Sequence, residues 1–166
     1  TKRYQHGRIG INGRLDTIQA AILLAKMELF NAEVNAREII GNRYTIELNK
    51  LGFSDTPYVS KENSSVYGQY TIQVDHRDKI ISCLKEKHIP TSIHYPSLLS
   101  EQEALLNDSS SNKNFLRRLF NIKRFKSFSI PNAQFVSKRV LSLPMHPNLS
   151  EDEQDLVISS LISSLK

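Results

Sequence analysis

The chain has 166 residues, 39% hydrophobic and 23% charged, which is typical of one globular domain and not of a disordered or fibrous protein. Its formal charge is +5, but the basic residues are spread along the chain, so the charge alone gives little support to nucleic-acid binding. No apolar run approaches the roughly 20 residues that a membrane span requires, and the single cysteine, Cys83, suits a cytoplasmic protein without an internal disulfide.

The first third of the chain carries a long helical pattern. Apolar residues recur at helical spacing over roughly 15–30 and 39–51, with no proline, and Gly52 follows as a C-cap. This spacing predicts two long helices, or one bent helix, over roughly 15–51, and then a loop over 53–65 that contains Pro57. The chain starts at Thr1, and its first ten residues already resemble the interior of a protein, so we expect a truncated N-terminus.

A small α/β layer is predicted next. Residues 66–74 alternate between apolar and polar side chains, which is typical of a strand with one buried face. A helix over about 77–88 follows, with Asp75 as its cap and Pro90 after its end. Thr91–Tyr95 is predicted to be a short second strand. The order strand, helix, strand indicates the beginning of an α/β layer.

The remaining part of the chain adds a polar spacer and further helices. Residues 107–114 form the spacer, and residues 117–126 mix basic with apolar residues, as a solvated amphipathic helix does; a phosphate-binding patch is the alternative. A helix over 131–139 and a strand over 140–143 follow. The last helix begins at a capping box formed by Ser150 and Glu153. Its expected apolar face consists of Leu156, Val157, Leu161, Ile162 and Leu165.

Three short segments carry candidate chemistry, and the first is Gly10–Asp16, just before the long helical stretch. The two glycines around Asn12 permit a backbone with positive φ and leave its amide accessible near a helix start, where free N–H groups favour an anion. Arg14 adds a planar fork of donors that suits a carboxylate or a phosphate. The alternative interpretation is a tight turn in which Arg14 pairs with Asp16 or another surface acid.

The second segment is Ile93–Pro96 and the third is Leu141–Pro147. His94 and Tyr95 can both donate to a carboxylate or a phosphate, and a half-buried aromatic corner is the alternative. His146, between two prolines, is interpreted as a turn residue rather than a ligand. The histidines lack metal-ligand spacing, so no metal site is predicted, and no Ser-His-Asp or Cys-His set can be assembled.

Four stretches, in order along the chain, resemble the DegT/DnrJ/EryC1/StrS family of sugar aminotransferases. Arg8–Leu23 is similar to the family signature G-x-N-x-R-x-D-x-x-Q-A-A, and Tyr67–Ile72, Ile89–Pro96 and Val140–Pro147 follow in the family's order. The first and third stretches most closely resemble the bacterial branch that aminates UDP-3-keto-N-acetylglucosaminuronic acid, an intermediate of lipopolysaccharide sugars.

The resemblance implies an α/β fold: the C-terminal part of a fold type I transferase that depends on pyridoxal 5'-phosphate. Residues 1–51 would be the end of the large domain and the long connecting helices, and residues 52–166 would be the small C-terminal α/β domain. No catalytic residue is expected in this chain, because the family's Schiff-base lysine lies upstream of the signature.

The resemblance also assigns site residues, because members of the family act as homodimers with composite active sites. Asn12 would reach the cofactor phosphate of the partner subunit. Arg14, His94 and Tyr95 would contact a nucleotide-sugar substrate. The implied parent enzyme aminates a nucleotide-linked keto-sugar for lipopolysaccharide or surface polysaccharide synthesis.

Two hypotheses from other classes remain. One is a catalytically inactive truncated gene product with a structural or regulatory role, whose long helical stretch would expose an apolar patch. The other is a nucleic-acid-binding regulator, which only the +5 charge supports. We therefore expect neither a nucleic-acid partner nor a membrane partner.

Overall fold

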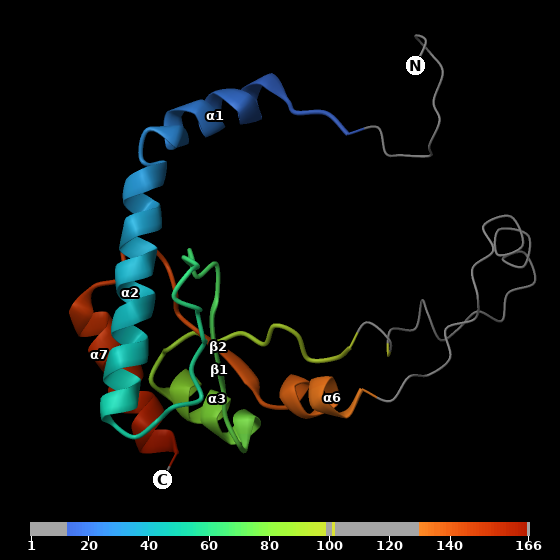
Figure 1. Cartoon of the computed structure of the whole chain (residues 1–166), viewed down its shortest axis with the longest axis vertical. Coiled ribbons are helices and arrows are strands. Elements are labelled where there is room, and N and C mark those ends of the chain that lie inside the picture. The colour runs from blue at the N-terminus through green and yellow to red at the C-terminus, as the bar shows by residue number, and fades with distance from the viewer. Residues whose placement is uncertain (1–12, 99–100, 102–129, 166) are drawn as a thin grey trace, which may run out of the picture.

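The computed structural model describes residues 13–98, 101 and 130–165 (Figure 1). Its elements, in chain order, are α1 (Thr17–Met27), α2 (Phe30–Lys50), β1 (Tyr70–Gln73), α3 (Arg77–Glu86), α6 (Pro131–Ser137), β2 (Val140–Leu143) and α7 (Glu151–Ser164). The predicted spacer at 107–114 and the predicted basic helix at 117–126 lie outside the described residues.

The two long helices predicted over 15–51 are confirmed. Asp16 caps α1 by accepting from the Ile18 N–H at 2.9 Å, and the side chain of Gln19 completes a capping box. The chain turns between Met27 and Phe30, and Figure 1 shows α1 directed away from the axis of α2.

The predicted stop at Gly52 is also confirmed. Gly52 has φ +84°, a left-handed conformation that glycine adopts without steric cost. Its N–H donates to the Asn49 carbonyl at 3.0 Å, and the Phe53 N–H donates to the Leu48 carbonyl at 2.9 Å. These two bonds satisfy carbonyls that the end of α2 would otherwise leave free.

Strands β1 and β2 pair antiparallel, with Tyr70 opposite Leu143 and Ile72 opposite Leu141. The expected second strand at Thr91–Tyr95 is wrong, because this segment forms only an isolated bridge between Ser92 and Ser142. Prolines at positions 90 and 96 flank the segment and have no N–H to donate, so a ladder cannot extend through either position.

One hydrophobic core joins the second half of α2, the two strands, α3 and α7. Buried members from these elements include Ile40, Tyr44, Leu48, Tyr70, Ile72, Ile80, Leu84, Leu141, Val157, Ile158 and Leu161. The buried Gln154 donates to the Ile40 carbonyl at 3.0 Å and ties α7 to α2. Residues of α2 share this core with the strands. The division into two domains between residues 51 and 52 stays a prediction.

Three tyrosines form the centre of this core. The Tyr44 and Tyr70 ring centroids are 4.9 Å apart, and those of Tyr67 and Tyr70 are 5.7 Å apart. The Tyr44 hydroxyl donates to the Pro144 carbonyl at 3.1 Å, and the Tyr70 hydroxyl lies 2.8 Å from Thr45 Oγ1. The buried hydroxyls are therefore hydrogen-bonded, as burial of polar groups requires.

The remaining elements differ from the sequence prediction mainly at their ends. Helix α3 begins after His76 and has no side-chain cap, so the cap expected from Asp75 is wrong; Asp75 pairs with Arg139 instead. Helix α3 ends at Glu86 and α6 ends at Ser137, both earlier than predicted. The strand at 140–143 is confirmed.

The capping box of α7 is confirmed: Ser150 N donates to Glu153 Oε2 at 2.8 Å, and the Glu153 N–H donates to Ser150 Oγ at 3.3 Å. These hydrogen bonds from Ser150 lower the pKa of the Glu153 carboxyl. The predicted apolar face is partly wrong, because Leu156 and Leu165 are exposed and Ile158 is buried instead. The helix meets α2 and α3 together, so its buried face is set by two neighbours and not by its own periodicity.

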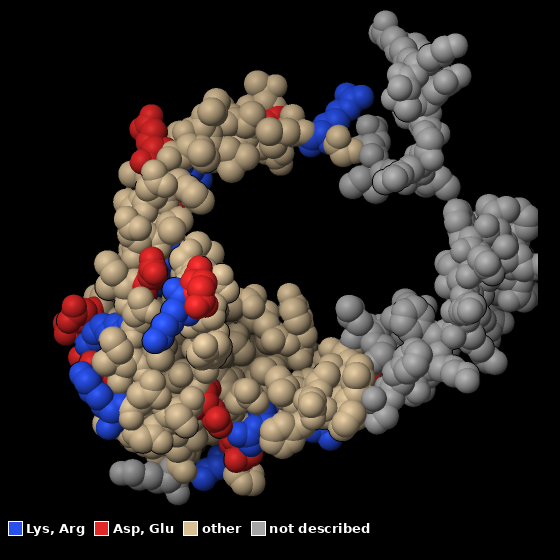
Figure 2. Space-filling model, viewed as in Figure 1, with Lys and Arg blue, Asp and Glu red and all other residues tan. Residues whose placement is uncertain are grey.

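Helix α1 has no buried residue, although most of its residues are apolar. Large apolar side chains from 15 to 30 are more than half exposed: Leu15, Ile18, Ile22, Leu23, Leu24, Met27, Leu29 and Phe30. Figure 2 shows that the surface of this helix carries few charged residues. The exposed apolar patch that the sequence predicts is therefore confirmed. A helix with so apolar a surface is normally buried, so this patch needs a cover. In the described residues, no helix has the length and apolarity needed to cross a membrane.

The tyrosine cluster predicts unfolding at alkaline pH. Burial raises the pKa values of Tyr44 and Tyr67, and it raises that of Tyr70 to about 12. A pKa that is higher in the folded state than in the unfolded state adds stability at low pH, and this stability is lost as pH rises. For Tyr70 the loss falls between pH 10 and about 12. At ~1.36 kcal/mol per pKa unit, Tyr70 alone gives a loss of roughly 2–3 kcal/mol.

Thermal melts followed by circular dichroism across this pH range test the expectation. The melting temperature should fall steeply above pH 10, together with a rise in tyrosinate absorbance. The Tyr70→Phe variant should show a shallower fall, since it removes one of the titrating groups. An equal slope for both proteins would contradict the assignment to Tyr70.

Candidate functional site

Arg14 lies in the extended segment just before α1 and is exposed. Its predicted alternative partner, Asp16, is engaged in the cap of α1. No ion pair joins Arg14 to a described residue, so its guanidinium is not neutralised by an acid in that part of the chain. Asn12 lies outside the described residues.

His94 and Tyr95 lie in the segment between α3 and residue 98. The His94 ring is half-buried, and its Nδ1 lies 2.9 Å from Ser142 Oγ. Tyr95 is 71% exposed, and its ring packs edge-on against His94 with the centroids 5.6 Å apart. The pair therefore has one ring held by the sheet and one ring open to solvent, and the hydroxyl of Tyr95 can meet a ligand.

Sequence reasoning missed two residues behind His94. Ser142 is a buried serine in β2, and Thr71 lies opposite it in β1, with 2.8 Å between Ser142 Oγ and Thr71 Oγ1. A signal was present in the sequence, since Ser142 is the one polar residue of the strand Val140–Leu143. A buried hydroxyl in an apolar strand needs a hydrogen-bond partner, so Ser142 indicated a buried polar contact at this position.

His146, interpreted as a turn residue, is exposed, and its carbonyl accepts from the Leu149 N–H at 3.2 Å. The turn interpretation is therefore confirmed. Within the described ranges, no group of three or more histidine, cysteine, aspartate or glutamate side chains could hold a metal ion.

The structure does not bring Arg14 next to His94 and Tyr95. No described hydrogen bond, ion pair or ring contact joins them, and Figure 1 shows α1 and the segment before it projecting away from the strand pair. Within one copy of the chain, these groups therefore do not form one binding site.

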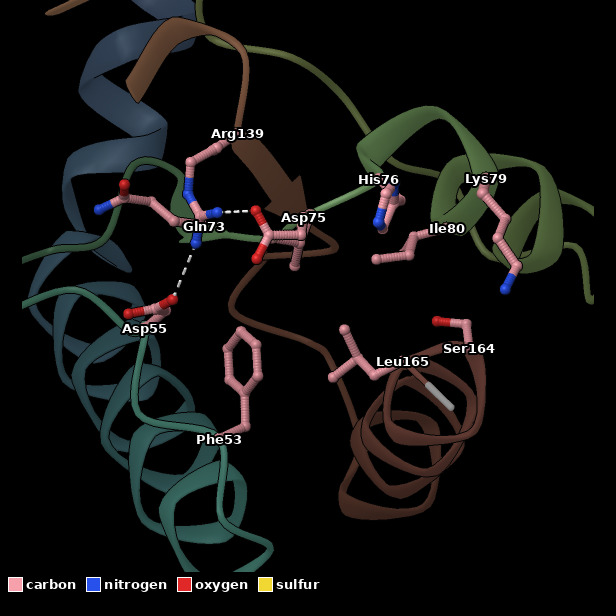
Figure 3. Close-up of a pocket in the computed structure, with 11 residues that line it drawn as sticks. Phe53, Asp55, Gln73, Asp75, His76, Lys79, Ile80, Arg139, Ser164 and Leu165 are labelled. Atoms are coloured by element: carbon pink, nitrogen blue, oxygen red, sulfur yellow. Dashed lines mark hydrogen bonds and ion pairs between the residues drawn. The ribbon is translucent and has the colours of Figure 1, made fainter. Parts of the chain in front are cut away.

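A cavity of about 220 Å³ lies between the start of α3 and the end of α7 (Figure 3). On one wall Arg139 pairs with Asp75 and, at 3.2 Å, with Asp55. The Arg139 guanidinium also stacks on the Phe135 ring, 4.9 Å from its centroid. Because two carboxylates already neutralise Arg139, this cluster ties the loop after α2 to both strands and is not a free anion-binding group.

Every lysine in the described ranges is exposed: Lys26, Lys50, Lys61, Lys79, Lys85, Lys87 and Lys138. A lysine that forms a Schiff base needs a desolvated pocket that lowers its pKa. None of these seven lysines is desolvated, and the position of the catalytic lysine outside this chain stays a prediction.

Long helices that lead into a small α/β layer are consistent with a fragment of a fold type I transferase. The family model for the DegT/DnrJ/EryC1/StrS aminotransferase family matches residues 1–162, and the chain belongs to this family.

Similar proteins support the same class. The chain is 34% identical over 160 residues to the UDP-2-acetamido-2-deoxy-3-oxo-D-glucuronate aminotransferase of Pseudomonas aeruginosa, covering 96% of this chain and 39% of that protein. It is 32% identical over 162 residues to a pleiotropic regulatory protein of Geobacillus stearothermophilus, with the same coverage.

A crystal structure of a DegT DnrJ EryC1 StrS aminotransferase from Brucella abortus is similar over 99% of this chain and 39% of that one, with a TM-score of 0.78 and 34% identity. The chain thus spans about 39% of the length of the relatives it matches.

Proposed function

We propose that the chain is the C-terminal, substrate-side part of an aminotransferase that moves an amino group to a nucleotide-linked keto-sugar for lipopolysaccharide or surface polysaccharide synthesis. The observation that carries the proposal is the exposed guanidinium of Arg14, which pairs with no acid among the described residues and lies in the stretch that the family model matches. The Pseudomonas aeruginosa relative acts, by its name, on a sugar uronate, and a uronate is a natural partner for that guanidinium.

In this proposal Arg14 holds the sugar carboxylate or the diphosphate through paired N–H donors. His94 and Tyr95 donate to other oxygens of the same substrate, His94 from its ring and Tyr95 from its hydroxyl. Their chemistry is binding and orientation, which lower the barrier by fixing the keto carbon relative to the amino donor.

The proposed cofactor is pyridoxal 5'-phosphate, which supplies the amino-group carrier chemistry when bound. Asn12 would reach its phosphate from the neighbouring subunit. The exposure of every described lysine supports placing the lysine that holds this cofactor outside these residues. We therefore assign no step of the reaction on the cofactor to this chain.

A composite homodimer accounts for the separation of Arg14 from His94 and Tyr95. The apolar surface of α1 supports this arrangement, because such a surface needs a cover in solution. The cover would come from the remainder of the aminotransferase fold and the partner subunit.

Cofactor labelling tests the proposed division of labour. The chain is incubated with pyridoxal 5'-phosphate, reduced with borohydride, digested and mapped by mass spectrometry. We expect weak labelling scattered over exposed lysines, because no described lysine lies in a desolvated pocket. The Pseudomonas aeruginosa relative serves as the control, with one lysine labelled stoichiometrically. A stoichiometric adduct at one lysine of this chain would overturn the division.

A structural or interaction role without catalysis is the second candidate, and the exposed apolar surface of α1 favours it. In that case the chain would associate with itself or with a separate N-terminal piece. A soluble monomer in size-exclusion chromatography counts against this candidate.

A further inference from the structure

Two of the stretches that resemble the family, Ile89–Pro96 and Val140–Pro147, meet at Ser142. Its backbone N–H donates to the Ser92 carbonyl at 2.8 Å, and its carbonyl accepts from the Ser92 N–H at 3.2 Å. Its hydroxyl lies 2.9 Å from His94 Nδ1. Backbone and side chain of Ser142 therefore hold both the position of the segment that carries His94 and the orientation of the His94 ring.

Thr71 extends this contact into a chain of three groups. Thr71 and Ser142 are paired residues of β1 and β2, and their hydroxyl oxygens are 2.8 Å apart. Ser142 is only 5% exposed, so water does not compete freely for its hydroxyl. The ring nitrogen, the serine hydroxyl and the threonine hydroxyl must share their protons in one consistent direction.

The three groups allow two consistent directions of hydrogen bonding. If Thr71 donates to Ser142 and Ser142 donates to Nδ1, each hydroxyl proton has an acceptor, and the ring carries its own proton on Nε2. In the reverse direction the Thr71 proton has no acceptor among the residues that the structure describes. Each direction leaves one donor without an acceptor among the described residues, the ring Nε2–H in the first and the Thr71 hydroxyl in the second. The first direction places this donor on His94, the residue proposed to meet the substrate.

We propose that Ser142 and Thr71 are positioning residues that hold His94 as the Nε2–H tautomer, so that the ring donates from Nε2 to an anionic oxygen of the substrate. The identity of the ligand and the choice of tautomer rest on the proposed function; the ring orientation does not. In this proposal the segment Leu141–Pro147 acts on the site through Ser142, which orients His94. The exposed His146 takes no part.

Nitrogen-15 NMR of the histidine rings tests the proposal in the whole chain at mildly alkaline pH, where imidazoles are neutral. In the unmodified chain, His94 should show a protonated Nε2 and an unprotonated, hydrogen-bonded Nδ1. Ser142→Ala should move the Nδ1 signal downfield, toward that of a free imidazole nitrogen. Thr71→Val should give a smaller shift in the same direction, and Thr71→Ser should restore the original value.

Ser160→Ala is the matched control, since Ser160 is an equally buried serine, 3% exposed, on α7. It should leave the His94 signals in place. Backbone amide spectra of β1 and β2 establish that each variant is folded. A protonated Nδ1 in the unmodified chain would overturn the proposal. So would His94 signals that stay at the unmodified chain's positions in both Ser142→Ala and Thr71→Val.

A second arm separates this inference from the proposed function. UDP-N-acetylglucosamine is the probe, and its addition should shift the Nε2 signal of His94 in the unmodified chain, with a smaller shift in Ser142→Ala. The probe is added both to the unmodified chain and to its complex with the remaining aminotransferase fold. If Nδ1 is hydrogen-bonded as stated but the probe shifts no His94 signal in either sample, the positioning role stands and the substrate assignment fails.

Discussion

Replacing Tyr70 by alanine is expected to lower the free energy of unfolding by about 3–5 kcal/mol, the cost of removing a large aromatic side chain from a core. Tyr70 is fully buried and packs between Tyr44 and Tyr67. Its loss would also leave Thr45 without its hydroxyl partner on β1. Such a cost is a large fraction of the stability of a small domain, so most of the cooperative transition should disappear.

Urea unfolding followed by circular dichroism measures this change, and Tyr58→Ala is the matched control. Tyr58 is 89% exposed, so the same substitution there should change the free energy of unfolding by less than about 0.5 kcal/mol. Equal effects at the two positions would mean that the tyrosine cluster does not form the core.

Replacing Arg14 by methionine is expected to weaken binding of a UDP-linked sugar uronate about 10–100-fold, because charge-assisted hydrogen bonds contribute about 1.5–3 kcal/mol. A hybrid enzyme provides the test, in which this chain replaces the matching part of the Pseudomonas aeruginosa relative. Calorimetry would compare UDP-2-acetamido-2-deoxy-D-glucuronate with UDP-N-acetylglucosamine, which lacks the carboxylate.

The two ligands separate the two anions that Arg14 could hold. An effect confined to the uronate places the guanidinium on the sugar carboxylate, and an equal effect on both places it on the diphosphate. Lys26→Met is the control, because it removes one exposed positive charge from α1 without touching the signature. Affinities unchanged by Arg14→Met would contradict the proposed role.

Local patterns in the sequence were sufficient for most of the fold. Helical spacing predicted α1 and α2, alternation predicted β1, and the Ser150–Glu153 capping box predicted the start of α7. These features depend on residues close together in the chain, which a periodicity can register.

Features that depend on distant partners could not be predicted in the same way. Asp75 was expected to cap α3, but Arg139, 64 residues away, takes its carboxylate. The strand expected at Thr91–Tyr95 has a single bridge, to a residue some 50 positions further along the chain. In both cases a tertiary contact prevailed over a local preference.

In the candidate site, too, some residues could be predicted from the sequence and others could not. Arg14, His94 and Tyr95 could be named from motifs, because their residue types and positions match a family pattern. Thr71 and Ser142 are 71 residues apart and meet only because β1 and β2 pair in one register. Their contact with His94 became visible only when that register was known.

The most direct test of the account is a crystal structure of the hybrid enzyme with UDP-2-acetamido-2-deoxy-D-glucuronate bound. We predict that one ligand molecule accepts hydrogen bonds from Arg14 of one subunit and from His94 and Tyr95 of the other. A ligand bound in the active site with Arg14 turned to solvent, or with His94 contacting only Ser142, would contradict the account.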